Sequence, residues 1–252
     1  VRGQLDLAIL DLELALKSNP RSALALANRG EVRRAKGDLQ GAWADFNAAL
    51  AVNPRNAVAL ASRGAVAALQ GDLHAALGDL DASLSLEPGY VAALAQRGAV
   101  RRLLRQYDGA LLDFDSALQA NPRDALSLAG RGEVLRILGR PEAAIKDLDS
   151  ALELDPWDVS ALANRGAAKL ALGFAADALR DLDGAVEMEP KNAFARATRG
   201  ACRSAQGAHD AAMADLDQAL QGSPEDVYAL FCRGTVRRKA GDYAGARADL
   251  DL

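Results

Sequence analysis

The chain has 252 residues, of which 50% are hydrophobic and 25% charged, with a net charge of -4. This apolar fraction excludes a wholly disordered chain and allows a sizeable buried core. No apolar run approaches the roughly 18 residues of a transmembrane helix, which excludes a membrane span. Two cysteines and two histidines leave little material for a disulfide framework or a metal centre, so we expect no cofactor.

The first predicted element is a helix within residues 1–22, the second half of a repeat unit. Residues 24–36 predict the next helix, because they are rich in Ala, Leu and Arg and carry apolar residues at three-and-four spacing. Gly37 and Asp38 interrupt this pattern, and residues 40–52 predict another helix, which Pro54 ends. No segment alternates with period two, so we expect no strands.

This two-helix pattern then recurs along the chain. Seven of the eight prolines stand exactly 34 residues apart, and an Arg-Gly pair keeps the same interval. A fixed period of this length is typical of a solenoid, in which each unit buries its apolar face against its neighbours. We predict six full units: 23–56, 57–90, 91–124, 125–158, 159–192 and 193–226. An incomplete seventh unit covers 227–252, and we expect the chain to be part of a longer protein.

With the recurring proline placed at position 32 of each unit, the pattern resembles the tetratricopeptide repeat over the whole chain. Position 4 is Leu in all but one unit, position 8 is always Gly, and position 20 is always Ala. Arg replaces the family's Leu at position 7, which makes this an Arg-Gly variant of the repeat. The resemblance implies an all-α, right-handed α-solenoid of helix-turn-helix repeats, with first helices lining a concave groove and second helices facing outward.

Arg at position 7 and Asp at position 23 recur in every full unit and flank the faces where the two helices meet. We hypothesise a ladder of Arg-Asp pairs that replaces aromatic packing, because the planar guanidinium can bind a carboxylate through two hydrogen bonds. The alternative is that both side chains reach water, so that each pair contributes only about 0–1 kcal/mol. The predicted ladder comprises Arg29, Arg63, Arg97, Arg131, Arg165, Arg199 and Arg233 with Asp45, Asp79, Asp113, Asp147, Asp181 and Asp215.

Charge is distributed unevenly between the helices. The first-helix windows, positions 2–14, hold 19 basic and 2 acidic residues, whereas the second-helix windows hold 4 basic and 25 acidic ones. By the resemblance, the groove is therefore basic, although seven of its charges are the ladder arginines. Alanine at position 5 in six units leaves room for a guest helix or peptide, and arginines favour carboxylates. The candidate partner-binding residues are Arg34, Arg102, Arg136, Arg238, Leu24, Val58, Leu126, Phe194 and Tyr228.

These features favour a non-enzymatic scaffold that binds one or more proteins, with an acidic or amphipathic segment in the groove. The alternative for the groove is a solvated charged face without a ligand. Two other functions stay open: a regulatory arm of a larger enzyme, and a helical-repeat nucleic-acid binder, which the acidic net charge and 4% aromatic content disfavour. The sequence contains none of the motifs GxxxxGK[ST], HExxH or GxSxG. We expect an intracellular soluble protein or a peripheral subunit.

Overall fold

The computed structural model describes residues 2–251, and all of the regular secondary structure in that range is α-helix. The fifteen helices are α1 (Arg2–Ser18), α2 (Ala23–Ala35), α3 (Leu39–Val52), α4 (Ala57–Leu69), α5 (Leu73–Leu86), α6 (Val91–Leu103), α7 (Tyr107–Ala120), α8 (Ala125–Ile137), α9 (Pro141–Leu154), α10 (Val159–Ala171), α11 (Ala175–Met188), α12 (Ala193–Ala205), α13 (His209–Gly222), α14 (Val227–Lys239) and α15 (Tyr243–Leu250). The predicted all-α fold of paired helices is confirmed. Val1 and Leu252, the outermost residues of the two predicted partial units, lie outside the described residues.

Helix starts and ends follow the recurring polar residues and glycines. Asn56, immediately before α4, accepts a hydrogen bond from the backbone N–H of Ala59 at 3.0 Å, which satisfies a donor of the first turn. Gly37, between α2 and α3, has a φ of 83°, a left-handed conformation that glycine adopts without a Cβ clash. Arg105 occupies the equivalent place between α6 and α7 with a φ of 59°. Each first helix therefore ends in a tight turn of three residues before the second helix begins.

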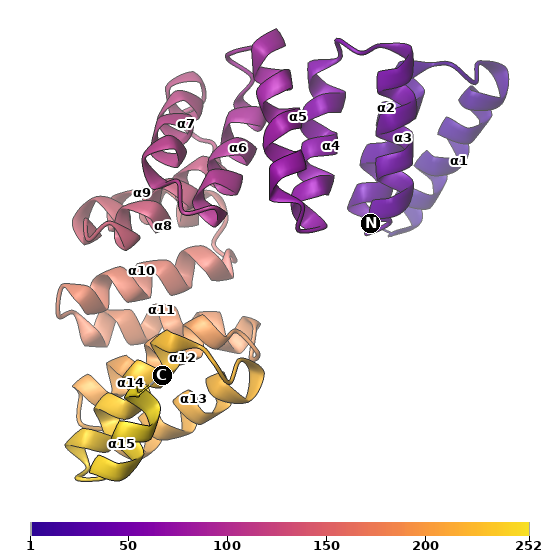
Figure 1. Ribbon diagram of the computed structural model, residues 1–252. Helices are drawn as coiled ribbons and strands as arrows, with labels where there is room; N and C mark the ends of the chain where they lie inside the picture. The colour runs from indigo at the N-terminus through magenta and orange to yellow at the C-terminus, as the bar shows by residue number, and fades with distance from the viewer. Residues whose placement is uncertain (1, 252) are drawn as a thin grey trace. The chain divides into compact units, whose positions relative to one another are not determined.

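The chain divides into two compact parts, residues 1–130 and 131–252, which we call the first half and the second half; the boundary lies inside α8. In the first half, α2 packs on α3, α4 on α5 and α6 on α7, as Figure 1 shows from indigo to magenta. Adjacent pairs contact through α3 with α4 and α5 with α6, while α1 packs on α2. The first helices α2, α4 and α6 also contact one another in sequence.

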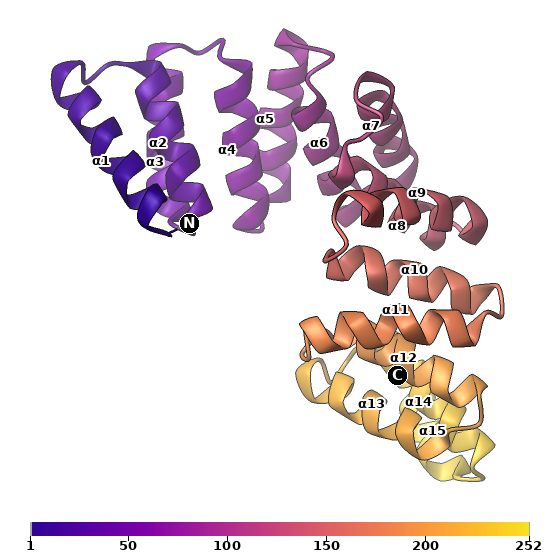
Figure 2. The ribbon, with the colours of Figure 1, turned by 180° about the vertical axis from the view of Figure 1, so that it is seen from behind.

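The second half repeats this arrangement. Here α10 packs on α11, α12 on α13 and α14 on α15, and Figure 2 shows these pairs from behind in orange and yellow. The contacts of α9 with α10, α11 with α12 and α13 with α14 join successive pairs. Among the described residues, no helix combines the length and apolarity needed to cross a membrane.

The two helices of a pair approach closely because small residues line their interface. Ala42, Phe46 and Ala49 on α3 are completely buried against α2. A Cβ built on Gly30 of α2 would lie 2.8 Å from the Phe46 ring, closer than van der Waals contact permits. The glycine at position 8 therefore sets how near the second helix can lie.

Candidate functional site on the first helices

The ladder arginines all bind the aspartate sixteen residues further along the chain. Arg165 on α10 donates from Nε to Oδ2 of Asp181 at 2.9 Å and from Nη2 to Oδ1 at 2.6 Å, a two-point contact with a carboxylate that is 7% exposed. The other pairs are Arg29–Asp45, Arg63–Asp79, Arg97–Asp113, Arg131–Asp147, Arg199–Asp215 and Arg233–Asp249. Asp249 is thus an additional partner, beyond the six predicted aspartates. Each pair joins the first helix of a unit to its second helix.

Two further contacts, which the sequence analysis did not assign, extend the ladder pair Arg165–Asp181. Lys169 at position 11 donates from Nζ to Oδ2 of Asp181 at 2.8 Å. Arg165 also donates from Nη1 to Oδ1 of Asp149, at position 25 of the preceding unit, at 2.7 Å. The recurring basic residue at position 11 and the recurring Asp at position 25 were the available sequence signals. Arg33, Arg101, Arg203 and Arg237 make the position-11 contact in their own units.

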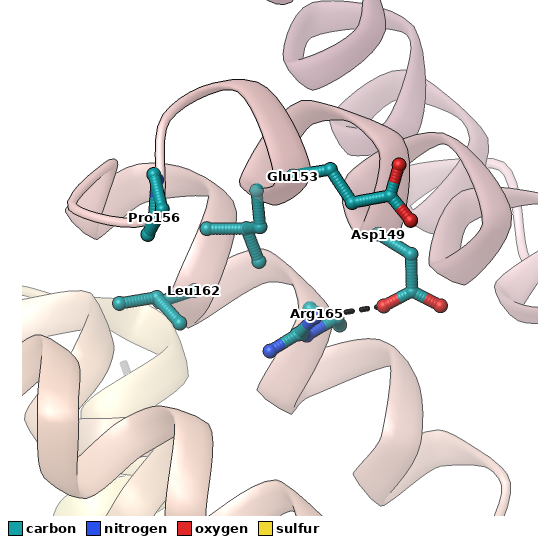
Figure 3. Close-up of a pocket in the computed structure, with 6 residues that line it drawn as sticks. Asp149, Glu153, Pro156, Leu162 and Arg165 are labelled. Atoms are coloured by element: carbon teal, nitrogen blue, oxygen red, sulfur yellow. Dashed lines mark hydrogen bonds and ion pairs between the residues drawn. The ribbon is translucent and has the colours of Figure 1, made fainter.

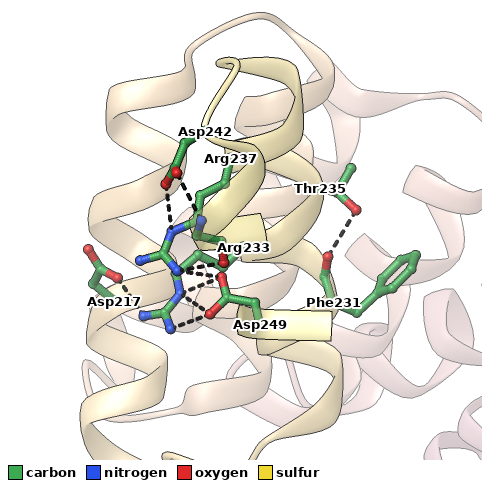
Figure 4. Close-up of polar contacts among 8 residues, drawn as sticks. Asp217, Phe231, Arg233, Thr235, Arg237, Asp242 and Asp249 are labelled. Atoms are coloured by element: carbon green, nitrogen blue, oxygen red, sulfur yellow. Dashed lines mark hydrogen bonds and ion pairs between the residues drawn. The ribbon is translucent and has the colours of Figure 1, made fainter. Parts of the chain in front are cut away.

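Figure 4 shows this network around Arg233, which contacts Asp249 of its own unit and Asp217 of the preceding one. In the unit 23–56, the hydrogen bond to Asp45 raises the pKa of Arg29 above its ordinary value, while burial acts in the opposite direction. The guanidinium therefore stays charged and bound within the fold. Seven arginines at position 7 and five basic residues at position 11 are engaged in this way, which leaves seven of the 19 basic residues of the first helices.

We call the residues at positions 2, 5, 9, 12 and 13 of the first helices the first-helix surface. Contrary to the expectation that alanine at position 5 leaves room for a guest, this position is buried in five units, so positions 2, 9, 12 and 13 form most of the open part of the surface: the buried alanines are Ala27, Ala61, Ala95, Ala163 and Ala197. The apolar residues predicted there are mostly solvent-exposed: Leu24 is 71% exposed, Val58, Leu126 and Tyr228 are also exposed, and Phe194 is partly buried. Figure 4 shows that Phe231 lies on the side of α14 away from the Arg233 network. The ladder and the first-helix surface are therefore separate parts of the same helices.

The four predicted surface arginines have different environments. Arg34 donates from Nε and Nη2 to Oε2 of Glu31, at 3.0 and 2.8 Å, so its charge is paired. Arg102, in the first half, is partly buried, and Arg238, in the second half, is exposed. The positive charge of the first-helix surface is therefore smaller than the sequence count indicates.

Within the second half, three of the predicted residues from different repeat units lie close together. The guanidinium of Arg136 lies 5.1 Å from the ring centre of Phe194 and donates from Nε to Oδ1 of Asn164 at 2.7 Å. The rings of Phe194 and Tyr228 are 6.1 Å apart at an angle of 40°. Although Tyr228 is exposed as a whole residue, burial around its hydroxyl raises its pKa, so the hydroxyl keeps its proton. This cluster presents flat apolar groups beside a cation.

The first half contains a hollow of about 300 Å³ on the first-helix surface, which we call the α4–α6 hollow. It is lined by Arg34, Ala65, Ala68, Leu69, Leu80, Gln96, Ala99, Val100, Leu103 and Leu126. Of these residues, the sequence analysis predicted only Arg34 and Leu126. The available signal was alanine at position 12 of the unit 57–90, between two units that carry Arg there.

A second hollow, of about 370 Å³, lies where the turn after α9 meets α10 (Figure 3). Asp149, Glu153 and Arg165 supply its polar groups, and Leu152, Pro156 and Leu162 its apolar wall. Figure 3 shows Arg165 bound to Asp149, so the ladder uses both charges. Within residues 2–251, no group of three or more His, Cys, Asp or Glu side chains is arranged to hold a metal ion.

Comparisons with known proteins agree with this architecture. A tetratricopeptide repeat model matches residues 1–50, 92–158 and 164–227. A tetratricopeptide repeat protein from Parabacteroides merdae is 24% identical, with a TM-score of 0.65 over 90% of both chains. The structure of the APC/C hetero-tetramer Cut9-Hcn1 is 18% identical, with a TM-score of 0.82 over 93% of this chain and 46% of that one.

YrrB, described as a TPR protein with an unusual peptide-binding site, is 25% identical, with a TM-score of 0.55 over 73% of this chain and 95% of that one. No curated protein is similar to the chain in sequence at a significant level. The family model covers more than half of the chain. The chain therefore belongs to the tetratricopeptide repeat family.

Proposed function

We propose that this chain is a non-enzymatic scaffold that binds protein partners on its first-helix surface, and that the Arg-Gly form of its repeat serves to hold the scaffold together. Tetratricopeptide repeat proteins are generally protein-interaction scaffolds. The ladder uses the position-7 arginines internally, which leaves the first-helix surface as the part of each first helix that is open to a partner.

The observation that carries this proposal is the exposure of large apolar side chains at position 2 of the first helices. Leu24 on α2, Val58 on α4 and Leu126 on α8 are exposed in the first half, where α6 carries Ala92 at this position, and Tyr228 on α14 is exposed in the second half. Exposed apolar groups that recur on one face are characteristic of interaction sites. The partner that fits is an amphipathic segment whose apolar face covers these residues and whose carboxylates bind the surface arginines. The peptide-binding site for which YrrB is described supports a peptide ligand.

The ladder also bears on the nucleic-acid alternative. A protein that follows a phosphate backbone needs a continuous row of available cations. Thirteen of the 19 basic residues in the first-helix windows are hydrogen-bonded to aspartates, Lys36 with Asp6 included, and Arg34 is paired with Glu31. The arrangement therefore favours a protein partner.

A peptide library displayed on phage tests the proposal. Peptides selected on the wild-type chain are expected to be acidic and amphipathic. They should bind at least tenfold more weakly to a variant in which Arg34, Arg102, Arg136 and Arg238 are changed to Glu. The matched control changes four exposed arginines outside the first helices to Glu, with the same change in net charge: Arg21, Arg55, Arg123 and Arg140. Circular dichroism establishes that both variants are folded. Equal binding to the two variants, or selection of basic peptides, would contradict the proposal.

A further inference from the structure

Trp157, in the turn between α9 and α10, exposes 75% of its surface to water. Its backbone N–H donates to Oδ1 of Asp155 at 3.0 Å, and Pro156 fixes the backbone before it, so the turn holds one shape. The repeat does not require an aromatic ring here, because the corresponding turns hold Arg21, Arg55, Gly89, Arg123, Lys191 and Glu225. Exposed tryptophans often dominate the binding energy of protein interfaces.

The hollow of about 370 Å³ shown in Figure 3, which we call the α9–α10 hollow, adjoins this turn, since Pro156 belongs to its apolar wall. Two of its three charged side chains balance each other: Nη1 of Arg165 donates to Oδ1 of Asp149 at 2.7 Å. The third, Glu153, is exposed and makes no hydrogen bond or ion pair within residues 2–251. The hollow therefore offers a guest one open carboxylate.

A corresponding hollow follows α13 and allows a comparison within the second half. It has about 450 Å³, and its lining residues stand two repeats after their counterparts: Asp217, Leu220, Gln221, Pro224 and Arg233. Its arginine binds its aspartate in the same way. However, neutral Gln221 stands in place of Glu153. In the turn that follows, Glu225 stands in place of Trp157. An open carboxylate in the wall and an exposed aromatic ring beside it therefore distinguish the α9–α10 hollow.

An arginine side chain fits this combination of groups. Its guanidinium can bind a carboxylate through two hydrogen bonds and stack on an aromatic ring, while its methylene groups pack on an apolar wall. Lysine carries a compact, strongly hydrated charge and stacks less well. A carboxylate guest would be repelled by Glu153, and an apolar guest would cover that charge without pairing it.

We propose that the α9–α10 hollow binds an arginine side chain of a protein partner, with the guanidinium between Glu153 and the ring of Trp157. Both side chains are exposed, so the guest reaches them without a rearrangement of the fold. The site lies outside the first-helix surface. It therefore goes beyond the proposed function and does not depend on it.

Titration of small probes into the full chain, followed by ¹H–¹⁵N NMR, tests this site. N-acetylargininamide should bind in the millimolar range and shift the indole N–H of Trp157 together with backbone amides of the turn. N-acetylcitrullinamide has nearly the same shape without the charge and should bind at least about tenfold more weakly. Raising the salt concentration to about 0.5 M should weaken binding of the arginine probe, because the carboxylate that it meets is exposed.

Two exchange variants keep the net charge of the chain unchanged. Glu153→Gln with Trp157→Glu gives the α9–α10 hollow the residues of the hollow after α13, and should lower the affinity at least about tenfold. Gln221→Glu with Glu225→Trp makes the reciprocal exchange and should create a second site, detected by shifts of amides between α13 and α14. All four residues are exposed, so both variants should fold, which circular dichroism checks.

Equal affinity for the arginine and citrulline probes would overturn the proposal, as would unchanged binding to the first exchange variant. Failure of the reciprocal variant to gain a site, or the absence of binding by the arginine probe, would also overturn it. Tighter binding of N-acetyllysinamide would overturn it in favour of an ammonium guest.

The library peptides separate this proposal from the proposed function. A peptide that is weakened by the first exchange variant, but not by changes to the surface arginines, uses the α9–α10 hollow. The opposite pattern assigns the peptide to the first-helix surface. Either proposal can therefore fail while the other stands.

Discussion

Replacing Asp181 with alanine removes the carboxylate that holds α10 to α11. Asp181 accepts three charge-assisted hydrogen bonds, two from Arg165 at 2.9 and 2.6 Å and one from Lys169 at 2.8 Å. Loss of one partner from a buried ion pair costs about 3–5 kcal/mol, because the remaining charges are left uncompensated. Arg165 and Lys169 keep 19% and 21% of their side-chain surface exposed, so water solvates part of their charge. We therefore expect a loss of about 3 kcal/mol, which lowers the Tm of a chain of this length by about 6–12 °C.

The control is Asp149→Ala, which removes another partner of the same arginine. Asp149 accepts from Arg165 at 2.7 Å but is 50% exposed, so its loss should cost less than about 1 kcal/mol. Urea unfolding followed at 222 nm, with hydrogen exchange of α10 and α11, measures both variants. A double-mutant cycle with Arg165→Met should give a coupling energy of about 1.5 kcal/mol or more to Asp181. Equal losses for the two aspartate variants, or additive effects in the cycle, would refute a stabilising ladder.

Three further predictions test local features of the fold. Arg105→Gly relieves the strain of a left-handed conformation and should raise the free energy of unfolding by up to about 1 kcal/mol, which is measured as a higher urea midpoint; a lower midpoint would contradict this. Gly166→Ala places a Cβ 2.7 Å from Cγ of buried Leu182 and should lower the stability measured by thermal unfolding by about 1–2 kcal/mol, whereas Gly184→Ala, with 3.9 Å to its nearest neighbour, should not lower it. Burial raises the pKa of Cys202 to about 12, so thiolate is scarce at pH 8 and a disulfide reagent should label the native chain far more slowly than the urea-unfolded chain; equal rates would contradict the buried thiol.

The helix pairs were predictable because their signals act within a few residues. Proline at position 32 removes a donor, glycine at position 15 permits a positive φ, and an Asx residue before a first helix binds its first turn. Asn56 and Gly37 show two of these local effects. The Arg-Asp spacing also belongs to one helix-turn-helix, since Arg165 and Asp181 stand sixteen residues apart in adjacent helices of one unit.

Contacts between different units could not be read from the repeat in the same way. Arg165 reaches back to Asp149, and Arg136 reaches forward to Asn164, because stacking brings side chains from different units to one place. The α4–α6 hollow likewise combines side chains from different units, among them Arg34, Ala68 and Leu126. Local sequence chemistry determines where each helix starts and stops, since it acts on neighbouring backbone groups. Which charges are neutralised and where a hollow forms depend on the distances between stacked helices, which arise only when the units pack together.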